Sequence, residues 1–173
     1  MNTTATNSMT AEDKTKNTLS LEDANSIKEH CLKLLRQARR EIFIYTPDFE
    51  HWLYDNDEVY EICKDFLLAH DRNRLQVILL DSSTCVRQGH ILLPLFERLA
   101  SRCALKKPHS YHDIPSASWL IVDRQAIMVR SRPEAIKAEV HYDSLLQNTR
   151  AREQFERIWL TAKPDVNLRK MKI

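Results

Sequence analysis

Two short apolar runs, separated by a helical stripe, constrain the fold of this chain more than any other feature. Glu41–Tyr45 reads EIFIY and Arg74–Leu80 reads RLQVILL, so both are rich in side chains that favour strands. Between them, Glu58–His70 carries apolar side chains at three- and four-residue spacing, which predicts an amphipathic helix. Strands that are apolar throughout must be covered on both faces. The pattern therefore predicts an α/β domain with a mixed β-sheet flanked by helices.

The remaining elements are predicted from the same two periods. A helix-start signature at Ser20 and Asp23 precedes an apolar stripe from Ile27 to Ala38, so we expect an amphipathic helix there. Two later apolar runs, separated by a polar turn, predict a hairpin. The other expected elements are a helix over Gln88–Ser101, a strand over Cys103–Lys106, the hairpin strands Ser118–Val122 and Ala126–Val129, a further strand over Glu139–Tyr142, and a closing helix over Leu145–Ala162 that Pro164 stops.

The two ends of the chain differ in composition from its middle. Residues 1–20 hold few large apolar side chains and cannot offset the entropy of ordering, so we expect a disordered tail there. Residues 21–163 are expected to form the folded domain, and residues 164–173 a basic tail. The first twenty residues lack a hydrophobic leader core, and no apolar run reaches the roughly 18 to 20 residues of a membrane span. We therefore expect neither secretion nor a membrane partner.

Cysteine and glycine usage narrows the chemistry. The four cysteines lie in or beside apolar segments without a CxxC pair, which favours buried free thiols in a reducing compartment and hence the cytoplasm. No ligand spacing joins them to the seven histidines, so neither a metal site nor a cofactor is expected. Gly89 is the only glycine, which excludes P-loop and dinucleotide-binding glycine loops. The net charge of +2 alone indicates neither nucleic acid nor membrane.

The stretch Ser116–Asp123 reads SASWLIVD and runs into the predicted hairpin. With the order of elements around it, this stretch resembles one half of the phospholipase D superfamily, whose motif is His-x-Lys-x-x-x-x-Asp. The histidine position corresponds to Ser116, the lysine position to Ser118 and the aspartate to Asp123. Phe155 and Trp159 resemble the closing Phe-x-x-x-Trp pattern of that family. The chain is also similar to uncharacterised phospholipase D-like domains found beside proteobacterial acetyltransferase domains, through Tyr45–Asp48, Leu53–Asp55 and Gly89-His90.

The resemblance covers residues 27–162 and implies a degenerate, bacterial half-domain. In the family the histidine attacks phosphorus and the lysine stabilises the phosphoryl oxygens. Ser116 and Ser118 supply neither an imidazole nor a positive charge, so we expect no catalysis. Asp123, at a strand-to-strand turn, is expected to hydrogen-bond its own backbone. Active members need two motif-bearing halves, so the resemblance also implies homodimerisation through the face beside the hairpin.

Polar residues near the expected carboxyl ends of strands form a second candidate group, because ligands of such folds gather at those ends. Asp48, His51, Asp81, His90 and Arg130 could line one remnant pocket, although surface or capping roles explain each of them equally well. A metal ion held by Asp48, His51 and His90 is a further alternative.

Positive charge gathers between Arg102 and Lys137, where seven Lys and Arg stand against three Asp and Glu. Such an excess could contact phosphates, or it could be a solvated face. Arg36, Arg39 and Arg40 add charge at the end of the first predicted helix, where the helix dipole favours cations. The expected phosphate contacts are Lys106, Lys107, Arg124 and Arg130.

These observations favour a non-catalytic phospholipase D-like domain that acts as a binding or regulatory module, with protein or nucleic acid as its partner. A phosphodiesterase or nuclease in which His90 or His112 substitutes for the motif is one alternative. A structural accessory protein that binds another protein is the other.

Overall fold

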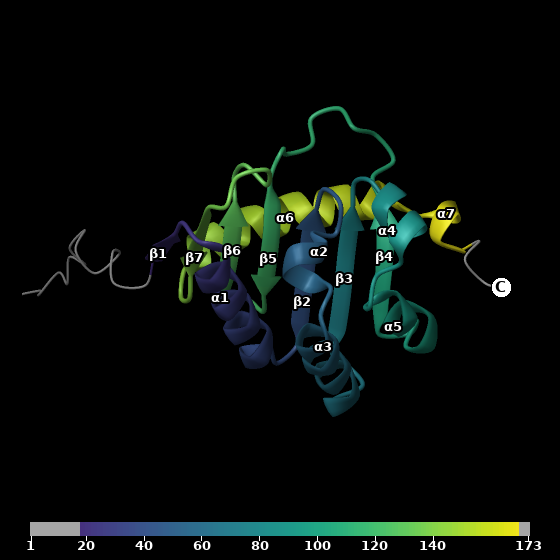
Figure 1. Cartoon of the computed structure of the whole chain (residues 1–173), viewed down its shortest axis with the longest axis horizontal. Coiled ribbons are helices and arrows are strands. Elements are labelled where there is room, and N and C mark those ends of the chain that lie inside the picture. Colours follow the sequence, from purple (N-terminus) through teal and green to yellow (C-terminus); the bar gives the residue numbers. More distant parts are fainter. Residues whose placement is uncertain (1–17, 170–173) are drawn as a thin grey trace, which may run out of the picture.

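The computed structural model of the protein describes residues 18–169. The rest of the expected disordered tail, residues 1–17, and the end of the expected basic tail, residues 170–173, lie outside the described residues. The elements, labelled in Figure 1, are β1 (Thr18–Leu21), α1 (Ala24–Gln37), β2 (Glu41–Thr46), α2 (His51–Tyr54), α3 (Asp57–Ala69), β3 (Arg74–Leu79), α4 (Ser83–Gln88), α5 (Leu93–Arg98), β4 (Cys103–Lys107), β5 (Ser118–Val122), β6 (Ala126–Arg130), β7 (Ala138–His141), α6 (Leu145–Thr161), β8 (Lys163–Pro164) and α7 (Val166–Arg169).

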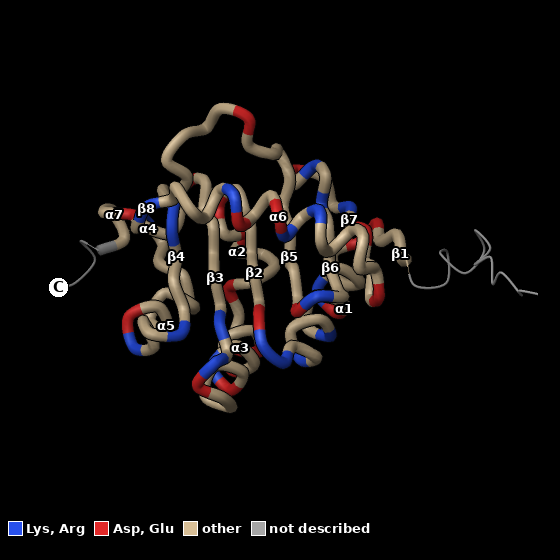
Figure 2. Tube along the Cα trace, turned by 180° about the vertical axis from the view of Figure 1, so that it is seen from behind, with Lys and Arg blue, Asp and Glu red and all other residues tan. Residues whose placement is uncertain are grey.

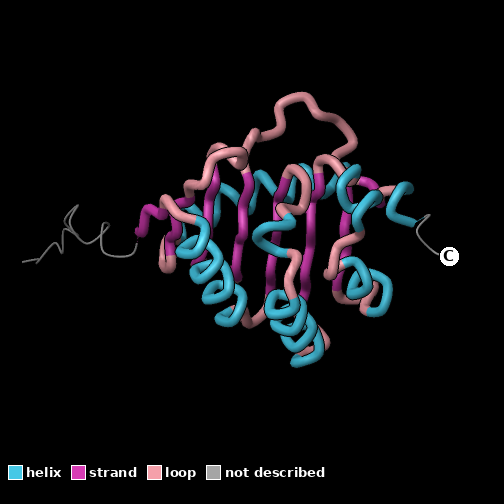
Figure 3. The backbone as a smooth tube through the Cα atoms, in the orientation of Figure 1, coloured by secondary structure: helices cyan, strands magenta, loops and turns pink. Residues whose placement is uncertain are grey.

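The strands form one mixed sheet in the order β1-β7-β6-β5-β2-β3-β4-β8. The central strands β2, β3 and β4 are parallel, and every other pairing is antiparallel. Helices α1 to α5 lie on one side of the sheet, and the long helix α6 crosses its other side (Figures 1 and 3). This arrangement confirms the predicted α/β fold with a mixed sheet covered by helices.

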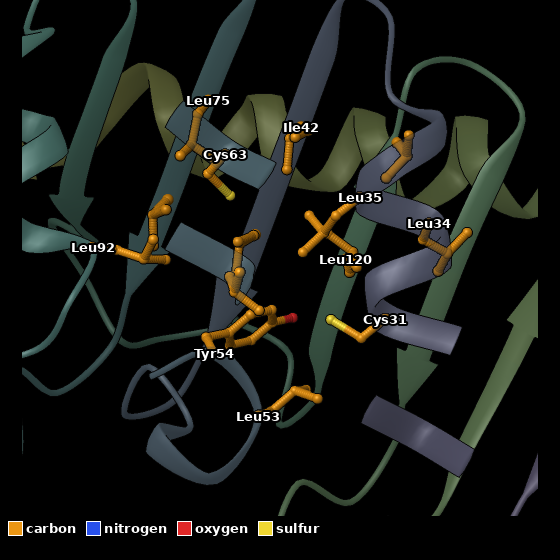
Figure 4. Close-up of a cluster of buried hydrophobic side chains, with 14 of the residues drawn as sticks. Cys31, Leu34, Leu35, Ile42, Leu53, Tyr54, Cys63, Leu75, Leu92 and Leu120 are labelled. Carbon is orange, nitrogen blue, oxygen red and sulfur yellow. The ribbon is translucent and has the colours of Figure 1, made fainter. Parts of the chain in front are cut away.

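The side chains of β2 explain why its sequence is apolar throughout. Ile42 and Ile44 pack into the larger core beneath α1 and α3, part of which Figure 4 shows. Phe43 and Tyr45 point to the opposite face and pack into the smaller core beneath α6. All four side chains are at most 4% exposed. Burying each stabilises the fold by about 1.5–3 kcal/mol, so loss of either helical layer would expose one half of this strand.

Helix α6 covers its face of the sheet with an aromatic row. Phe155 stacks on Phe43 with ring centroids 4.8 Å apart, and Trp159 stacks on Phe155 at 5.8 Å. Lys106 places its ammonium group 4.3 Å from the centroid of the Trp159 ring. The Phe-x-x-x-Trp spacing therefore places both rings on one side of the helix, where they seal the smaller core.

The structure corrects the predicted start of the domain. Residues Thr18–Leu21, expected to be tail and helix start, pair with Ala138–His141 as an antiparallel edge strand. The first helix begins at Ala24 instead, because the Asp23 carboxylate accepts the Ser26 N–H at 2.8 Å and caps the helix. The signature at Ser20 was wrong, since its backbone is committed to the sheet.

The predicted helix over Gln88–Ser101 is shorter in the structure, where α5 spans only Leu93–Arg98. Gln88 instead ends α4 (Ser83–Gln88), which was not predicted, and Gly89 follows it with a φ of 76°, in the left-handed region that glycine adopts without a steric penalty. The short helix α2 was not predicted at all. The expected basic tail contributes β8, which pairs with β4, and α7. Two-residue strands and single-turn helices carry too little periodicity to be found from sequence.

Two further sequence predictions concern the whole of residues 18–169. In that part of the chain no helix is long and apolar enough to cross a bilayer. The cysteines are free and buried, as predicted.

Candidate functional site

The carboxyl ends of β2 and β3 lie at the same edge of the sheet as the start of β5 and the end of β6. The register explains this, because Tyr45 pairs with Trp119 across β2 and β5, and Ser118 pairs with Arg130 across β5 and β6. Strand β5 is antiparallel to β2, so it begins where β2 ends. Its first residue, Ser118, is the one that the sequence resemblance places at the lysine position of the phospholipase D motif. This edge, called the motif edge below, is where a phospholipase D-type site would be expected.

A buried charged cluster occupies the motif edge. Arg130 forms an ion pair with Glu50, which lies in the connection between β2 and α2. Ser118 donates a hydrogen bond to the second carboxylate oxygen of Glu50, and Thr46 donates to the same oxygen at 3.3 Å. Glu50 is 3% exposed and Arg130 1%. We call these four residues the Glu50 network.

Arg130 has further partners besides Glu50, although its Nε donates no hydrogen bond within the described residues. Its guanidinium donates to the carbonyl oxygens of Pro133 and Ala135, the second at 2.7 Å. The same group lies 4.9 Å from the centroid of the Trp52 ring. Burial lowers the pKa of Arg130 from its ordinary value, while neighbouring carboxylates oppose that shift. The arginine therefore reads as a structural cation with its charge already neutralised, rather than one open to a ligand.

Glu50 reaches the network through an unusual backbone. Phe49 and Glu50 have φ values of 66° and 35°, so two successive residues with side chains adopt the left-handed region. This conformation costs on the order of 1–3 kcal/mol per residue. Phe49 offsets that cost by packing, since it is fully buried and stacks on His90 with ring centroids 4.0 Å apart. The ion pair with Arg130 holds Glu50 in place.

His90 is a neutral residue of the core. Its Nε2–H donates to the Phe49 carbonyl at 3.2 Å, and its Nδ1 accepts the Leu92 N–H at 3.3 Å. Burial lowers the pKa of His90 to about 4; His51 adds to that shift, and Asp55 opposes it. Both ring nitrogens are thus engaged, which leaves the imidazole no lone pair with which to attack a substrate.

The predicted remnant pocket is brought together only in part. His51 and His90 are neighbours, with ring centroids 4.9 Å apart, and His51 donates to the Gly89 carbonyl at 2.9 Å. Asp48 and Asp81 are exposed, and each carboxylate accepts a nearby backbone N–H, from Glu50 and Ser83. Hydrogen bonds from Ser83 lower the pKa of Asp81. Arg130 belongs to the Glu50 network instead. Among residues 18–169, no group of three or more His, Cys, Asp and Glu is placed to hold a metal ion.

The three motif positions lie in different environments. Ser116 is exposed in the loop before β5, whereas Ser118 is buried in the Glu50 network. Asp123 lies at the other end of β5, on the opposite edge of the sheet. Its carboxylate does not bond its own turn; it accepts the backbone N–H groups of Arg39, Arg40 and Glu41 at 2.8–3.0 Å. Asp123 thus joins the end of α1 to the start of β2.

The four expected phosphate contacts do not form one patch. Lys106 and Lys107 end β4, three strands away from β5 in the sheet. Arg124 lies at the turn between β5 and β6, and Arg130 lies at the far end of β6. A run of sequence that crosses a hairpin places its charges at opposite edges of the sheet.

Glu50 is the residue of this site that the sequence did not point to. It lies in the polar run Pro47-Asp48-Phe49-Glu50-His51, which reads as a surface connection. The sequence does not distinguish a buried glutamate from an exposed one. Here the distinction depends on the arginine partner, which lies 80 residues later in the chain. Pairing across the sheet is the signal that would have identified it, and a single sequence does not contain that signal.

A separate groove of about 600 Å³ lies between α5, β4 and α7. Its walls are mainly apolar and include Leu93, Phe96 and Leu168. His90 also borders it, but that side chain has no exposed surface. Glu97, Cys103 and Asp165 also line the groove, and none of them belongs to the Glu50 network.

Comparison with known protein families places this chain in one of them. The model of a domain of unknown function, DUF7931, matches residues 23–171. The chain belongs to the DUF7931 family. A search of curated proteins finds no match for this DUF7931 chain. Its fold, by contrast, has many similar solved structures.

Two of those structures are NucT and Nuc, and the second is a phospholipase D family member. NucT from Helicobacter pylori is 10% identical, with a TM-score of 0.59 over 86% of the DUF7931 chain and 97% of NucT. Nuc from Salmonella typhimurium, a phospholipase D family member, is 11% identical, with a TM-score of 0.57 over 84% of this chain and 95% of Nuc. At such identities the likeness shows the fold alone. The phospholipase D-like fold predicted from the sequence is thereby confirmed.

A third similar structure belongs to TrmBL2, an archaeal chromatin protein whose structure shows a novel mode of DNA binding. It is 13% identical to the DUF7931 chain, with a TM-score of 0.59 over 87% of this chain. The DUF7931 chain spans about half of TrmBL2, 54% of its length.

Proposed function

We propose that this domain is a degenerate phospholipase D-like half-domain that binds a partner without cleaving phosphodiesters. The observation that carries the proposal is the Glu50 network. At the motif edge, phosphoryl transfer needs a cation that is free to meet the phosphoryl oxygens. Arg130 is instead neutralised by Glu50, and the Ser118 hydroxyl is bound to the same carboxylate.

The groups that could supply a nucleophile support the same proposal. Ser116 is exposed, and in residues 18–169 no side chain hydrogen-bonds its hydroxyl, so nothing activates it. His90 is buried with both nitrogens engaged. His112 lies in the exposed loop that connects β4 to β5. Among residues 18–169, therefore, neither these histidines nor Ser116 is prepared to act as the nucleophile of a phosphodiesterase or nuclease at the motif edge.

A hydrolysis assay tests this proposal directly. The full chain is incubated with bis(p-nitrophenyl) phosphate and with end-labelled single- and double-stranded DNA and RNA, in separate arms with Mg²⁺ and with a chelator. We expect no turnover above the buffer blank. Cleavage that His90→Ala or His112→Ala abolishes would overturn the proposal, provided that the matched variant His109→Ala, in the same loop as His112, retains it.

We also propose a homodimer that uses the face beside the hairpin. Strands β5 and β6 each pair with a strand on both sides, so neither is free to pair with a strand of a second copy. A dimer contact beside the hairpin must therefore use the ends of these strands and the connections between them. The connection after β6 offers Ile136, an exposed apolar side chain. Light scattering during gel filtration distinguishes the states, since a mass of 20.4 kDa would contradict the dimer and twice that mass would support it.

The buried free thiols support a reducing, cytoplasmic compartment.

A further inference from the structure

The edge of the sheet opposite the motif edge carries a basic hollow. Strands β2 and β3 begin there and β5 ends there, so the connections before β2 and β3 lie beside the β5–β6 turn. Together with the start of α6, they line a hollow of about 820 Å³. Four arginines contribute to its lining, Arg39, Arg40, Arg72 and Arg124, and we call it the arginine hollow. Figure 2 shows basic segments at the starts of β2 and β3.

The acidic groups of the hollow are largely engaged elsewhere. The Asp123 carboxylate accepts three backbone N–H groups. Glu41 forms an ion pair with Arg152 at 2.5 Å. Asp143 is the remaining acid in the lining. Four arginines therefore face two carboxylates outside the Glu41–Arg152 pair, and the hollow keeps an excess of positive charge.

The arginine side chains are available to a ligand. Arg39, Arg72 and Arg124 are exposed, and within residues 18–169 none of the three forms an ion pair. Arg40 makes one long hydrogen bond, 3.5 Å, to the Asn73 side chain. This differs from Arg130, whose guanidinium is enclosed at the motif edge. An exposed guanidinium without a carboxylate partner retains its planar set of donors for a phosphate.

Helix dipoles explain only part of this arrangement. Arg39 and Arg40 follow the carboxyl end of α1 and Arg72 follows that of α3, where cations are favoured in any protein. Arg124 follows a strand, so that explanation does not apply to it. The amino end of α6, with no acidic residue in its first turn, also meets the hollow at Leu145 and adds positive potential. Three separate connections thus converge on one cationic concavity.

We propose that the arginine hollow binds the phosphodiester backbone of a nucleic acid. Exposed contacts to single phosphates are weak, so useful affinity requires a ligand that presents several phosphates at once, as a nucleic acid strand does. The hollow offers arginines from three segments for such a series. The site lies away from the motif edge, so binding there requires no catalysis, and the proposal goes beyond the non-catalytic role inferred above.

Fluorescence anisotropy of the full chain with labelled single- and double-stranded DNA and RNA tests the proposal at about 50 and 200 mM salt. Replacing Arg39 and Arg124 together by Gln removes two exposed charges. We expect at least a tenfold loss of affinity at the lower salt, and a decrease of about 1.5 to 2 in the slope of log affinity against log salt. The matched control, Lys106→Gln with Lys107→Gln, removes the same charge at the other edge and should change affinity less than about twofold.

Three outcomes would overturn the proposal. The first is no binding by the unmodified chain at the lower salt. The second is an equal loss in the arginine and lysine double variants, which would indicate diffuse attraction. The third is competition by poly-glutamate as effective as by unlabelled oligonucleotide, which would indicate an acidic protein partner. If circular dichroism shows that the first variant is unfolded, Arg72→Gln with Arg124→Gln provides the same comparison. The hydrolysis assay above is independent, so the two proposals can fail separately.

Discussion

Breaking the Glu50–Arg130 ion pair should be among the most destabilising changes that a single polar side chain can undergo in this domain. Both side chains are almost fully buried, and removing one partner of such a pair leaves an uncompensated charge, at a cost of about 3–5 kcal/mol. Glu50→Gln should lower the free energy of unfolding by about 3 kcal/mol, the lower end of that range, because Arg130 keeps two carbonyl acceptors and the face of Trp52. Arg130→Met should cost more, since Glu50 keeps only two hydroxyl donors.

Urea unfolding of the two single variants and of the double variant measures the coupling between the residues. With a slope of about 1–3 kcal/mol per molar urea, a loss of about 3 kcal/mol moves the midpoint by at least about 1 M. The double variant removes both charges, so it should lose less stability than the sum of the singles by about 2 kcal/mol or more.

Arg132→Met is the matched control, because this arginine is exposed two residues after Arg130 and should change the free energy of unfolding by less than about 0.5 kcal/mol. Single variants that each cost under about 1 kcal/mol, or a double variant equal to their sum, would refute the reasoning. Either result would mean that the pair is solvated or that its members are independent.

Three further predictions concern His90, the cysteines and Asp123. The pKa of His90, about 4 in the fold, lies below the ordinary value of about 6.5 that it regains on unfolding, so the unfolded chain binds the proton first as the pH falls. The free energy of unfolding should therefore decrease by about 2 kcal/mol between about pH 7 and 4.5, and His90→Gln should lack that component; equal pH slopes for both proteins would contradict this. Burial raises the pKa of Cys63, Cys85 and Cys103 to about 12, so a thiol reagent at about pH 8 should label them only after denaturant is added, and rapid labelling of the native protein would be inconsistent with their burial. Asp123→Asn weakens the hydrogen bonds from three backbone N–H groups and should lower the free energy of unfolding in urea by about 1–3 kcal/mol. The variant should show no more hydrolysis than the unmodified chain. An unchanged urea midpoint would count against the structural role of Asp123.

The sequence predicted best those strands and helices whose apolar side chains are buried against other elements of the fold. Strand β2 reads as apolar throughout because both α1 and α6 cover it, and the hairpin was found with both strands placed correctly. Strand β1 was missed because it is held by backbone bonds to β7, with only one of its four residues buried. Helix α4 was missed because Ser83–Gln88 carries only two apolar side chains, Cys85 and Val86, too few to show a helical period.

The candidate site shows a different limit, since a residue type does not state whether its charge is available. Arg124 and Arg130 are six residues apart, and counting charge along the chain joins them in one basic segment. Strand β6 separates them by about 13 Å or more, at roughly 3.3 Å per residue, and places one at each edge of the sheet. Arg124 is exposed and has no ion-pair partner in the described part of the chain, whereas Arg130 is neutralised in the core.

That separation decides which variant can report on nucleic-acid binding. Neutralising Lys106, Lys107 and Arg130 together, as the basic segment in the sequence suggests, would weaken binding by unfolding the domain even if none of them touched a phosphate. A loss of affinity in that variant would therefore support the wrong surface. Arg124, at the other end of the strand that carries Arg130, can be neutralised without opening the core. If an Arg124 variant loses affinity while its urea midpoint is unchanged, the loss comes either from a direct contact with the nucleic acid or from general electrostatic attraction to it. Comparing its change in salt slope with that of the Lys106 and Lys107 double variant separates these two causes.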